Sequence, residues 1–201
     1  ARPGTSVGPV LIVRTPDQYG PHPAAEYPIR ETATIEPRSF YGSSKAAQEV
    51  LALQMWRGRQ LPVVCTRSFN HSGVGHAESY LLPALVRRAA TLPASGGSLR
   101  IGNATPVRDY LHVLDVVDAY LLLLERGTVG DVYNVCSGEG ISVQQLAERV
   151  LKRRGIHADV ISDPALSRPS DTPFLVGDNT KLQGATGWRP RRSVDDIMDE
   201  L

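Results

Sequence analysis

The residues in this chain best suited to chemistry are a tyrosine and a lysine four positions apart, Tyr41 and Lys45. They open a predicted helix over residues 42–58, and residues four apart lie on one face of a helix. A cation held beside a phenol favours loss of the phenolic proton. The pair therefore suits a general acid or base that acts on an alcohol or a carbonyl. The same spacing also fits an ordinary helix start with a solvated lysine.

Further polar candidates follow two apolar, β-rich runs at residues 10–13 and 63–66. Such runs predict strands that are buried on both faces, as in parallel sheets. Thr15 and Asp17 follow the first run, and Asn70 lies in a polar, glycine-bearing segment, 67–75, after the second. In open α/β sheets, binding and catalysis take place beyond the carboxyl ends of the strands. These residues are therefore candidates for the same site, although each also fits a plain turn or loop.

Strands and helices alternate along the chain, which indicates an α/β fold with a largely parallel sheet. Residues 20–38 form a proline-rich loop, and Asp115 and Asp118 are expected to face solvent or to cap a first helical turn. The remaining predicted elements are helices 80–91, 114–126, 143–154, 179–185 and 193–200, and strands 99–101, 132–135 and 160–161.

Composition excludes several classes of protein. The chain of 201 residues, with 22 basic and 21 acidic side chains, is long enough for one domain and lacks the charge excess of a nucleic-acid-binding protein. We find no apolar run of membrane-spanning length and no signal peptide, so we expect a cytoplasmic protein. Cys65 and Cys136 lie in apolar runs, where reduced, buried thiols are expected. The five histidines lack metal-ligand spacing, so we expect no metal.

Six motifs in order resemble the extended short-chain dehydrogenase/reductase (NAD-dependent epimerase/dehydratase) family that acts on nucleotide sugars. Within that family the chain is most similar to the GDP-mannose branch, which includes the 4,6-dehydratase and the GDP-6-deoxy-4-keto-mannose reductase. Residues 131–138 and 181–190 look more like the reductase. The motifs cover nearly the whole chain, and they lie at residues 15–20, 41–45, 67–75, 107–110, 112–116 and 168–171.

The resemblance implies the C-terminal part of a Rossmann-type parallel sheet with an interleaved small α/β substrate-binding region. Residues 1–76 would be the remainder of the Rossmann-type domain, and residues 77–201 would mainly bind substrate, with strand 131–135 returning to the first sheet. No G-x-x-G-x-x-G motif follows a first strand. We therefore expect about a hundred residues, including the cradle for the cofactor phosphates, upstream of Ala1. Without them, strand 10–14 would present an open edge.

The resemblance also implies catalytic roles for four residues, with NAD or NADP as cofactor. Tyr41 would give a proton to the sugar C4 oxygen, and Lys45 would hold the nicotinamide ribose and tune Tyr41. Thr15 would hydrogen-bond to the same reacting oxygen. Asp17 stands where the dehydratases carry a glutamate, and its shorter side chain favours the reductase reading.

A further five residues are implied in binding the nucleotide-diphosphate sugar, with a GDP-sugar favoured. Asn70 would contact the phosphate or the sugar. Arg108 and Arg168 would clamp the diphosphate, which suits the forked donors of guanidinium. Arg87 is a weaker candidate for the same clamp, and Asp171 belongs to the last motif. Each arginine also fits an ordinary surface or structural ion pair.

Three hypotheses for function follow. The first is an NAD(P)H-dependent reductase of GDP-4-keto-6-deoxy-mannose that forms GDP-rhamnose. The second is a GDP-mannose 4,6-dehydratase or a nucleotide-sugar 4-epimerase, which would use the same residues. The third is a non-catalytic nucleotide-sugar-binding module. The resemblance further implies a possible homodimer, formed through helices 42–58 and 79–91.

Overall fold

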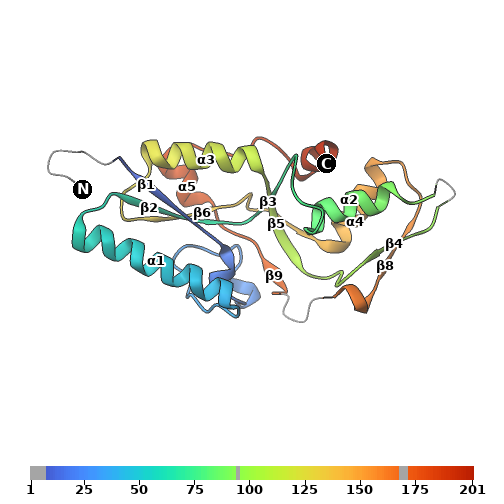
Figure 1. Cartoon of the computed structure of the whole chain (residues 1–201), viewed down its shortest axis with the longest axis horizontal. Helices are drawn as coiled ribbons and strands as arrows, with labels where there is room; N and C mark the ends of the chain where they lie inside the picture. Colours follow the sequence, from blue (N-terminus) through green and yellow to red (C-terminus); the bar gives the residue numbers. More distant parts are fainter. Residues whose placement is uncertain (1–7, 94–95, 168–171) are drawn as a thin grey trace.

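Three short apolar strands form the sheet of one lobe of the molecule. The computed structural model describes residues 8–93, 96–167 and 172–201. Strands β1 (Val10–Arg14), β2 (Val63–Ser68) and β6 (Val132–Val135) are parallel and lie in the order β1-β2-β6. Among the described strands, β1 is therefore an edge of this sheet (Figure 1).

Helices cover both faces of this sheet. Helix α1 (Phe40–Arg59) lies on one face, and α3 (Val113–Arg126) and α5 (Thr180–Thr186) lie on the other (Figure 1). Successive side chains of each strand point to opposite faces of the sheet. On the face covered by α3 and α5, Val64 and Tyr133 pack with Leu123 of α3 and Leu182 of α5 in one apolar core. The 3₁₀ helices η1 (Pro16–Gln18) and η2 (Ala24–Glu26) follow β1.

The second lobe is built around β5 (Val107–His112). It pairs in parallel with β3 (Asn70–Ser72) and β9 (Phe174–Leu175), and antiparallel with β7 (Gly140–Ser142). A separate parallel pair joins β4 (Ser98–Ile101) to β8 (Asp159–Ser162), which precedes the 3₁₀ helix η3 (Pro164–Leu166). The apolar core of this lobe is enclosed by three helices, α2 (Leu81–Ala90), α4 (Val143–Arg153) and α6 (Val194–Glu200).

The α/β class is confirmed, but two segments differ from expectation. The polar segment 67–75 is not simply a loop, because β2 continues to Ser68 and β3 follows at once. Strand β5 was not predicted, since Arg108, Asp109 and His112 interrupt any apolar pattern. Tertiary hydrogen bonds to these polar residues replace the apolar burial that usually marks a strand.

Asp115 is also not where the sequence places it. It is fully buried, and its carboxylate accepts hydrogen bonds from the backbone N–H groups of Arg191 and Arg192 and from the Arg192 guanidinium. The segment before α6 folds back over the first turn of α3. Asp115, in that first turn, is therefore buried and fixes this segment to α3. Such a long-range contact has no local sequence signal.

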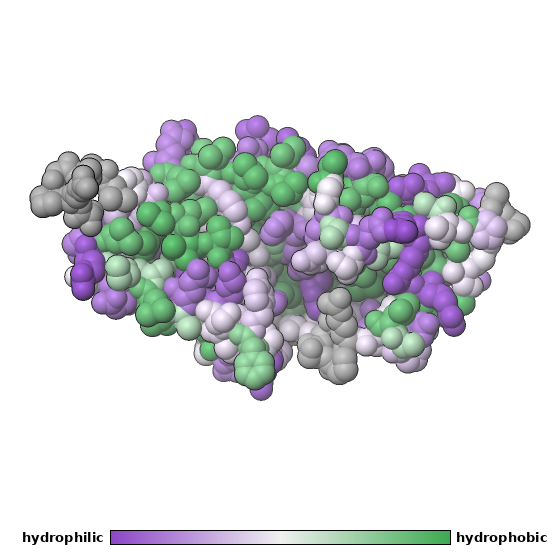
Figure 2. Space-filling view, viewed as in Figure 1, coloured by the Kyte–Doolittle hydropathy of each residue, from purple (hydrophilic) through white to green (hydrophobic). Residues whose placement is uncertain are grey.

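Apolar side chains remain exposed on the first lobe. Figure 2 shows a broad hydrophobic area there, and the exposed apolar residues of β1 and α3 include Val13, Leu114, Val117 and Leu121. Within the described residues, no helix is both long and apolar enough to cross a bilayer.

Candidate active site

Tyr41 and Lys45 lie on the same face of α1, as their spacing predicts. Ser39 caps the helix, because its hydroxyl accepts a hydrogen bond of 2.9 Å from the N–H of Gly42. The Lys45 Nζ lies 5.8 Å from the centre of the Tyr41 ring, and the tyrosine is 54% exposed. A phenol and an ammonium are thus presented together in the first turns of α1, within reach of a bound molecule.

Thr15 and Asp17 lie at the carboxyl end of β1, on the turn that forms η1. The Thr15 hydroxyl oxygen caps this turn by accepting from the N–H of Asp17 at 3.3 Å. The turn packs directly on α1, since a β-carbon built on Gly42 would lie 2.8 Å from the backbone oxygen of Asp17. The structure therefore brings this turn against the first turn of α1, next to Tyr41.

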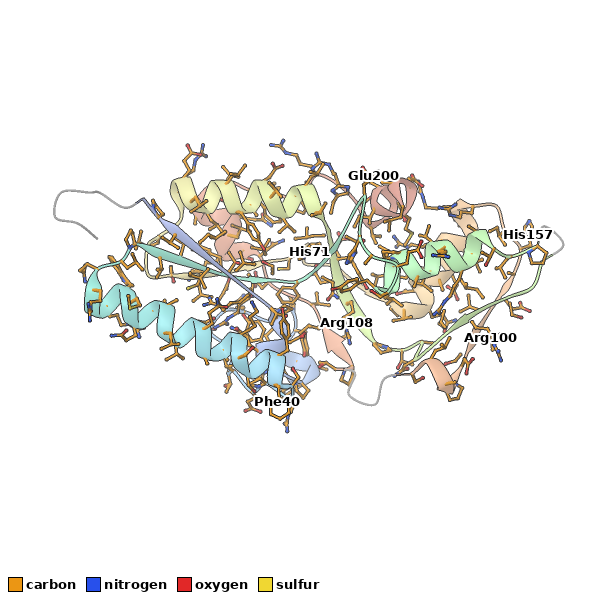
Figure 3. All side chains as sticks on the ribbon, in the orientation of Figure 1. Phe40, His71, Arg100, Arg108, His157 and Glu200 are labelled. Atoms are coloured by element: carbon orange, nitrogen blue, oxygen red, sulfur yellow. The ribbon has the colours of Figure 1, made fainter. Side chains whose placement is uncertain are left out.

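Arg108 lies on β5 where the two lobes meet (Figure 3). Its charge acts on both Asp17 and Tyr27, so its guanidinium is close to the turn that follows β1. Burial raises the pKa of the Asp17 carboxyl, although part of the residue is exposed, and Arg108 opposes that rise. Candidate catalytic and candidate phosphate-binding residues from different lobes thus approach one another here.

The other candidate binding residues have different surroundings. Asn70 is exposed on β3 and pairs in register with Tyr110, two residues beyond Arg108. Arg87 is exposed on α2 and forms an ion pair with Glu78, which is the structural alternative that its sequence context allowed. Arg168 and Asp171 lie outside the described residues.

A buried carboxylate, Asp109, supports the strand that carries Arg108. It accepts hydrogen bonds from the N–H and hydroxyl of Ser137, both at 2.7 Å, and from the N–H groups of Gly138 at 2.9 Å and Gly177 at 3.3 Å. Burial raises its pKa to about 6, and these hydrogen bonds oppose that rise. Asp109 therefore ties β5 to the turn after β6 and to the residues after β9.

Sequence reasoning missed a second buried carboxylate, Glu49, on α1. It is 5% exposed and contacts Arg14 of β1, Arg67 of β2 and Gln18 of η1. The available signal was the repeated spacing of four residues, 41, 45 and 49, which continues the candidate catalytic face along the helix. Arg67 was assigned to a loop, so its role as the buried partner of a carboxylate was not foreseen.

The described residues contain no cluster of three or more histidine, cysteine or acidic side chains that would hold a metal ion. Cys65 and Cys136 are buried free thiols, as expected. Burial raises the pKa of both thiols, so neither is prepared to act as a nucleophile.

Comparison with known proteins places this geometry in context. A family model described as GDP-mannose 4,6 dehydratase matches residues 10–201. GDP-6-deoxy-D-mannose reductase from Pseudomonas aeruginosa is 33% identical over 189 residues, covering 93% of this chain and 62% of that protein. Human dTDP-D-glucose 4,6-dehydratase is 28% identical over 186 residues, covering 90% of this chain and 51% of that protein. The chain thus spans about half to two thirds of these relatives.

Solved structures give the same picture. The structure of RMD from Pseudomonas aeruginosa complexed with NADPH superposes with a TM-score of 0.86 at 32% identity, over 96% of this chain and 65% of that one. UDP-glucose 4-epimerase from Thermotoga maritima, solved with UDP-glucose, superposes with a TM-score of 0.83 at 26% identity, over 96% of this chain and 61% of that one.

Proposed function

This chain belongs to the GDP-mannose 4,6-dehydratase family, and we propose that its protein reduces the C4 ketone of GDP-4-keto-6-deoxy-mannose with NADH or NADPH, forming GDP-rhamnose. The observation that carries the proposal is the pairing of Tyr41 with Lys45 on one face of α1, beside the turn that bears Thr15 and Asp17. The relative with 33% identity, a GDP-6-deoxy-D-mannose reductase, favours this reaction over the others in the family.

The residues present fit the nicotinamide end of such a cofactor. The half-exposed Tyr41 and the ammonium of Lys45 offer donors for ribose hydroxyls on one open helix face. A reduced nicotinamide, when bound, supplies the hydride that adds to C4 of the sugar. Tyr41 then gives its phenolic proton to the C4 oxygen, so that the ketone becomes an alcohol and the cofactor is oxidised.

Thr15 has a hydroxyl suited to stabilising the developing charge on that oxygen. Its oxygen already accepts from the N–H of Asp17, and a hydroxyl can accept and donate at the same time. The Thr15 proton therefore remains available for the C4 oxygen. A donor fixed before the reaction stabilises the transition state without reorganisation.

One observation favours a second candidate, dehydration. Burial raises the pKa of Asp17, which suits a carboxyl that transfers a proton during elimination of water. Asp17 would then do the work of the glutamate that the dehydratases carry, from one methylene further away. A 4,6-dehydratase and a 4-epimerase therefore remain alternatives whose products the experiment below distinguishes.

We assign the diphosphate of the substrate to Arg108, with Asn70 on the neighbouring strand contacting phosphate or sugar. The forked guanidinium donors of Arg108 suit two phosphate oxygens, and its strand is anchored by Asp109. Arg168 and Asp171 complete the proposed set by sequence. Arg87 contributes less, because Glu78 neutralises it.

The organisation proposed for the chain keeps residues 1–76 as the chemical part and residues 77–201 as the mainly substrate-binding part. Not only strand 131–135 but also α3 and α5 return to the first sheet.

We propose a cytoplasmic homodimer that binds neither nucleic acid nor membrane. Its contact would be the exposed, uncharged stripe of α1, which contains Ala47, Val50, Leu51 and Met55. Helix α2, the other helix expected at the dimer contact, lies in the other lobe (Figure 1), so the contact proposed here uses α1 alone.

The test is product analysis with the full-length protein. We expect GDP-rhamnose from GDP-4-keto-6-deoxy-mannose and NADH or NADPH, and no 4-keto product from GDP-mannose alone. Tyr41→Phe should lower kcat at least 100-fold while substrate affinity changes little, as expected for loss of a general acid. Tyr80→Phe, at an exposed tyrosine of the other lobe, is the matched control. Full turnover by Tyr41→Phe contradicts the proposal, and substrate binding without any turnover supports the non-catalytic alternative.

A further inference from the structure

Glu49 extends the face of α1 that carries Tyr41 and Lys45. Residues 41, 45 and 49 recur every four positions, so the three side chains follow one another along the helix. The Glu49 carboxylate accepts from Arg67 Nε at 3.1 Å and Nη2 at 2.6 Å, and from Gln18 Nε2 at 2.7 Å. A second cation, Arg14, approaches it with Nη2 at 3.1 Å. The exposed candidate catalytic face therefore continues into a buried ionic cluster.

The sheet beneath this cluster presents a row of polar side chains. Arg14, Arg67 and Asn134 are register partners on β1, β2 and β6, so all three point to the α1 face of the sheet. Asn134 accepts a hydrogen bond of 2.7 Å from the Tyr19 hydroxyl, and the Arg67 guanidinium lies 4.6 Å from the centre of the Tyr19 ring. Tyr19, which directly follows η1, is thus fixed by contacts with two members of this row, Asn134 and Arg67.

Gln18 connects the row and α1 to the turn that bears Thr15 and Asp17. Gln18 is the last residue of η1 and is fully buried, and its amide reaches Glu49 on α1. The backbone of Asp17 rests against Gly42 at the other end of the same contact. The turn and the helix are therefore joined at two points, Gly42 and Glu49, which both lie on α1 after Tyr41.

We propose that Glu49, acting through Gln18, is a positioning residue that sets the placement of Thr15 and Asp17 relative to Tyr41. The inference rests on the proposed function, because that function gives Thr15 and Tyr41 a shared reacting oxygen. A donor and an acid that serve one oxygen must be placed to within a fraction of an ångström. A fixed hydrogen bond between the two supporting elements meets that requirement, whereas the turn alone is only three residues long.

Charge decides which variant tests the idea. Glu49 faces two buried arginines, and removal of its charge leaves both without compensation, which destabilises the fold itself. A change at neutral Gln18 breaks the link between turn and helix and leaves the ion pairs intact. Gln18→Met is suitable, because methionine is unbranched, similar in length and adapts to a buried site.

The experiment compares Gln18→Met with Gln48→Met in the full-length protein. Gln48 is an exposed residue of α1, so its variant is the matched control. We expect Gln18→Met to lower kcat about 10-fold to 100-fold, with KM for the nucleotide sugar within about twofold, since misplacement acts on the reacting atoms and not on the distant phosphate contacts. Gln48→Met should match the wild type in both constants.

A swapped pair distinguishes positioning from a merely structural role. The double variant Gln18→Glu with Glu49→Gln keeps one carboxylate and one amide in the cluster, so the hydrogen bond between positions 18 and 49 is restored with its partners exchanged. Its unfolding free energy, measured in urea, shows whether Arg14 and Arg67 remain compensated. We expect it to recover at least half of the kcat lost in Gln18→Met, on a logarithmic scale. A wild-type kcat in Gln18→Met, or a fall in kcat that the swap does not reverse, overturns the inference.

Failure of the proposed function gives a different result. If Tyr41→Phe is inactive and Gln18→Met is fully active, only the positioning role is wrong. If Tyr41→Phe turns over at the wild-type rate, the site itself is misassigned and the positioning role falls with it.

Discussion

The α-carbon of Gly42 faces the backbone carbonyl of Asp17 so closely that a β-carbon there would lie 2.8 Å from the carbonyl oxygen. Real β-carbons do not approach a backbone oxygen at that distance without movement of one partner. The residue that follows Tyr41 is therefore a glycine because the turn after β1 occupies the place of a side chain. This contact explains how the two halves of the candidate active site come together.

Gly42→Ala should weaken both activity and stability. Alanine favours a helix interior by about 1 kcal/mol relative to glycine, but the displaced turn costs about 1–3 kcal/mol. We expect a net loss of unfolding free energy and a kcat lowered about 10-fold. Gly58→Ala is the control in the same helix, because its β-carbon would meet only the end of the flexible Gln54 side chain. Urea denaturation and steady-state kinetics of both variants test this, and equal behaviour of the two would refute the contact argument.

Arg108→Lys should raise KM for the nucleotide sugar about 10-fold or more while kcat changes little. Lysine keeps the charge but loses the forked donors that match two phosphate oxygens. Arg100→Lys serves as the control, since Arg100 is an exposed residue of β4 that pairs with Asp163 and has no proposed role in binding. Steady-state kinetics with varied substrate measures both. A KM that rises equally in the two variants would contradict the assignment of the diphosphate to Arg108.

Stability should fall between about pH 4 and pH 7 because of Asp109. Burial raises its pKa from 3.8 to about 6, so the folded state holds the proton more tightly than the unfolded chain. Its contribution is fully present below pH 3.8 and is lost as the pH rises through about 6. The total loss is on the order of 2–3 kcal/mol.

Asp109→Asn removes this titration, so the difference in unfolding free energy between wild type and variant should change with pH across that window. Urea denaturation at half-unit intervals of pH measures it, and other titrating groups cancel in the difference. Glu49 acts in the opposite direction. Burial alone would raise the pKa of Glu49, but Arg67 and Arg14 outweigh burial and lower it. The contribution of Glu49 to stability is therefore lost only below about pH 4.5. A difference that does not vary between pH 4 and pH 7 would rule out a raised pKa for Asp109.

Gln60→Gly should stabilise the protein by about 1 kcal/mol. Gln60 ends α1 with φ of 55°, in the left-handed region that side chains resist and glycine accepts. Gln54→Gly is the control, because it makes the same substitution in the interior of the same helix. It should lower the unfolding free energy by about 1 kcal/mol. Thermal or urea unfolding gives both signs. Destabilisation by Gln60→Gly would show that the side chain itself holds the end of the helix.

Leu51→Lys should disrupt the proposed homodimer. Leu51 is 65% exposed in the uncharged stripe of α1, and a charge in the centre of an apolar contact is costly. Val74→Lys, at an apolar residue 75% exposed in a loop, is the matched control. Sedimentation of the full-length variants at several concentrations measures the mass. If both variants remain dimers, the contact lies elsewhere on the surface. If the wild type is a monomer, the proposed homodimer is wrong.

Much of the first lobe could be predicted from sequence because its signals are local. Continuous apolar runs marked the strands at 10–13, 63–66 and 132–135, and one spacing of four residues placed Tyr41 and Lys45 on a common helix face. The link between Gln18 and Glu49 spans 31 positions, and that between Asp109 and Ser137 spans 28. Such contacts have no period or composition that marks them. The polar strand β5 was missed for the same reason, since its partners are distant in sequence.

The row formed by Arg14, Arg67 and Asn134 has a consequence for the pairing of the strands. Successive side chains of a strand point to opposite faces, so a slip of β1 by one residue would turn Arg14 into the apolar layer beneath α3. There its guanidinium would lie far from the Glu49 carboxylate, and an isolated buried charge costs several kcal/mol. β1 is an edge among the described strands, where only one neighbour can align it. The charge at its last residue thus specifies a single alignment of β1 with β2, which apolar side chains alone would specify less strictly.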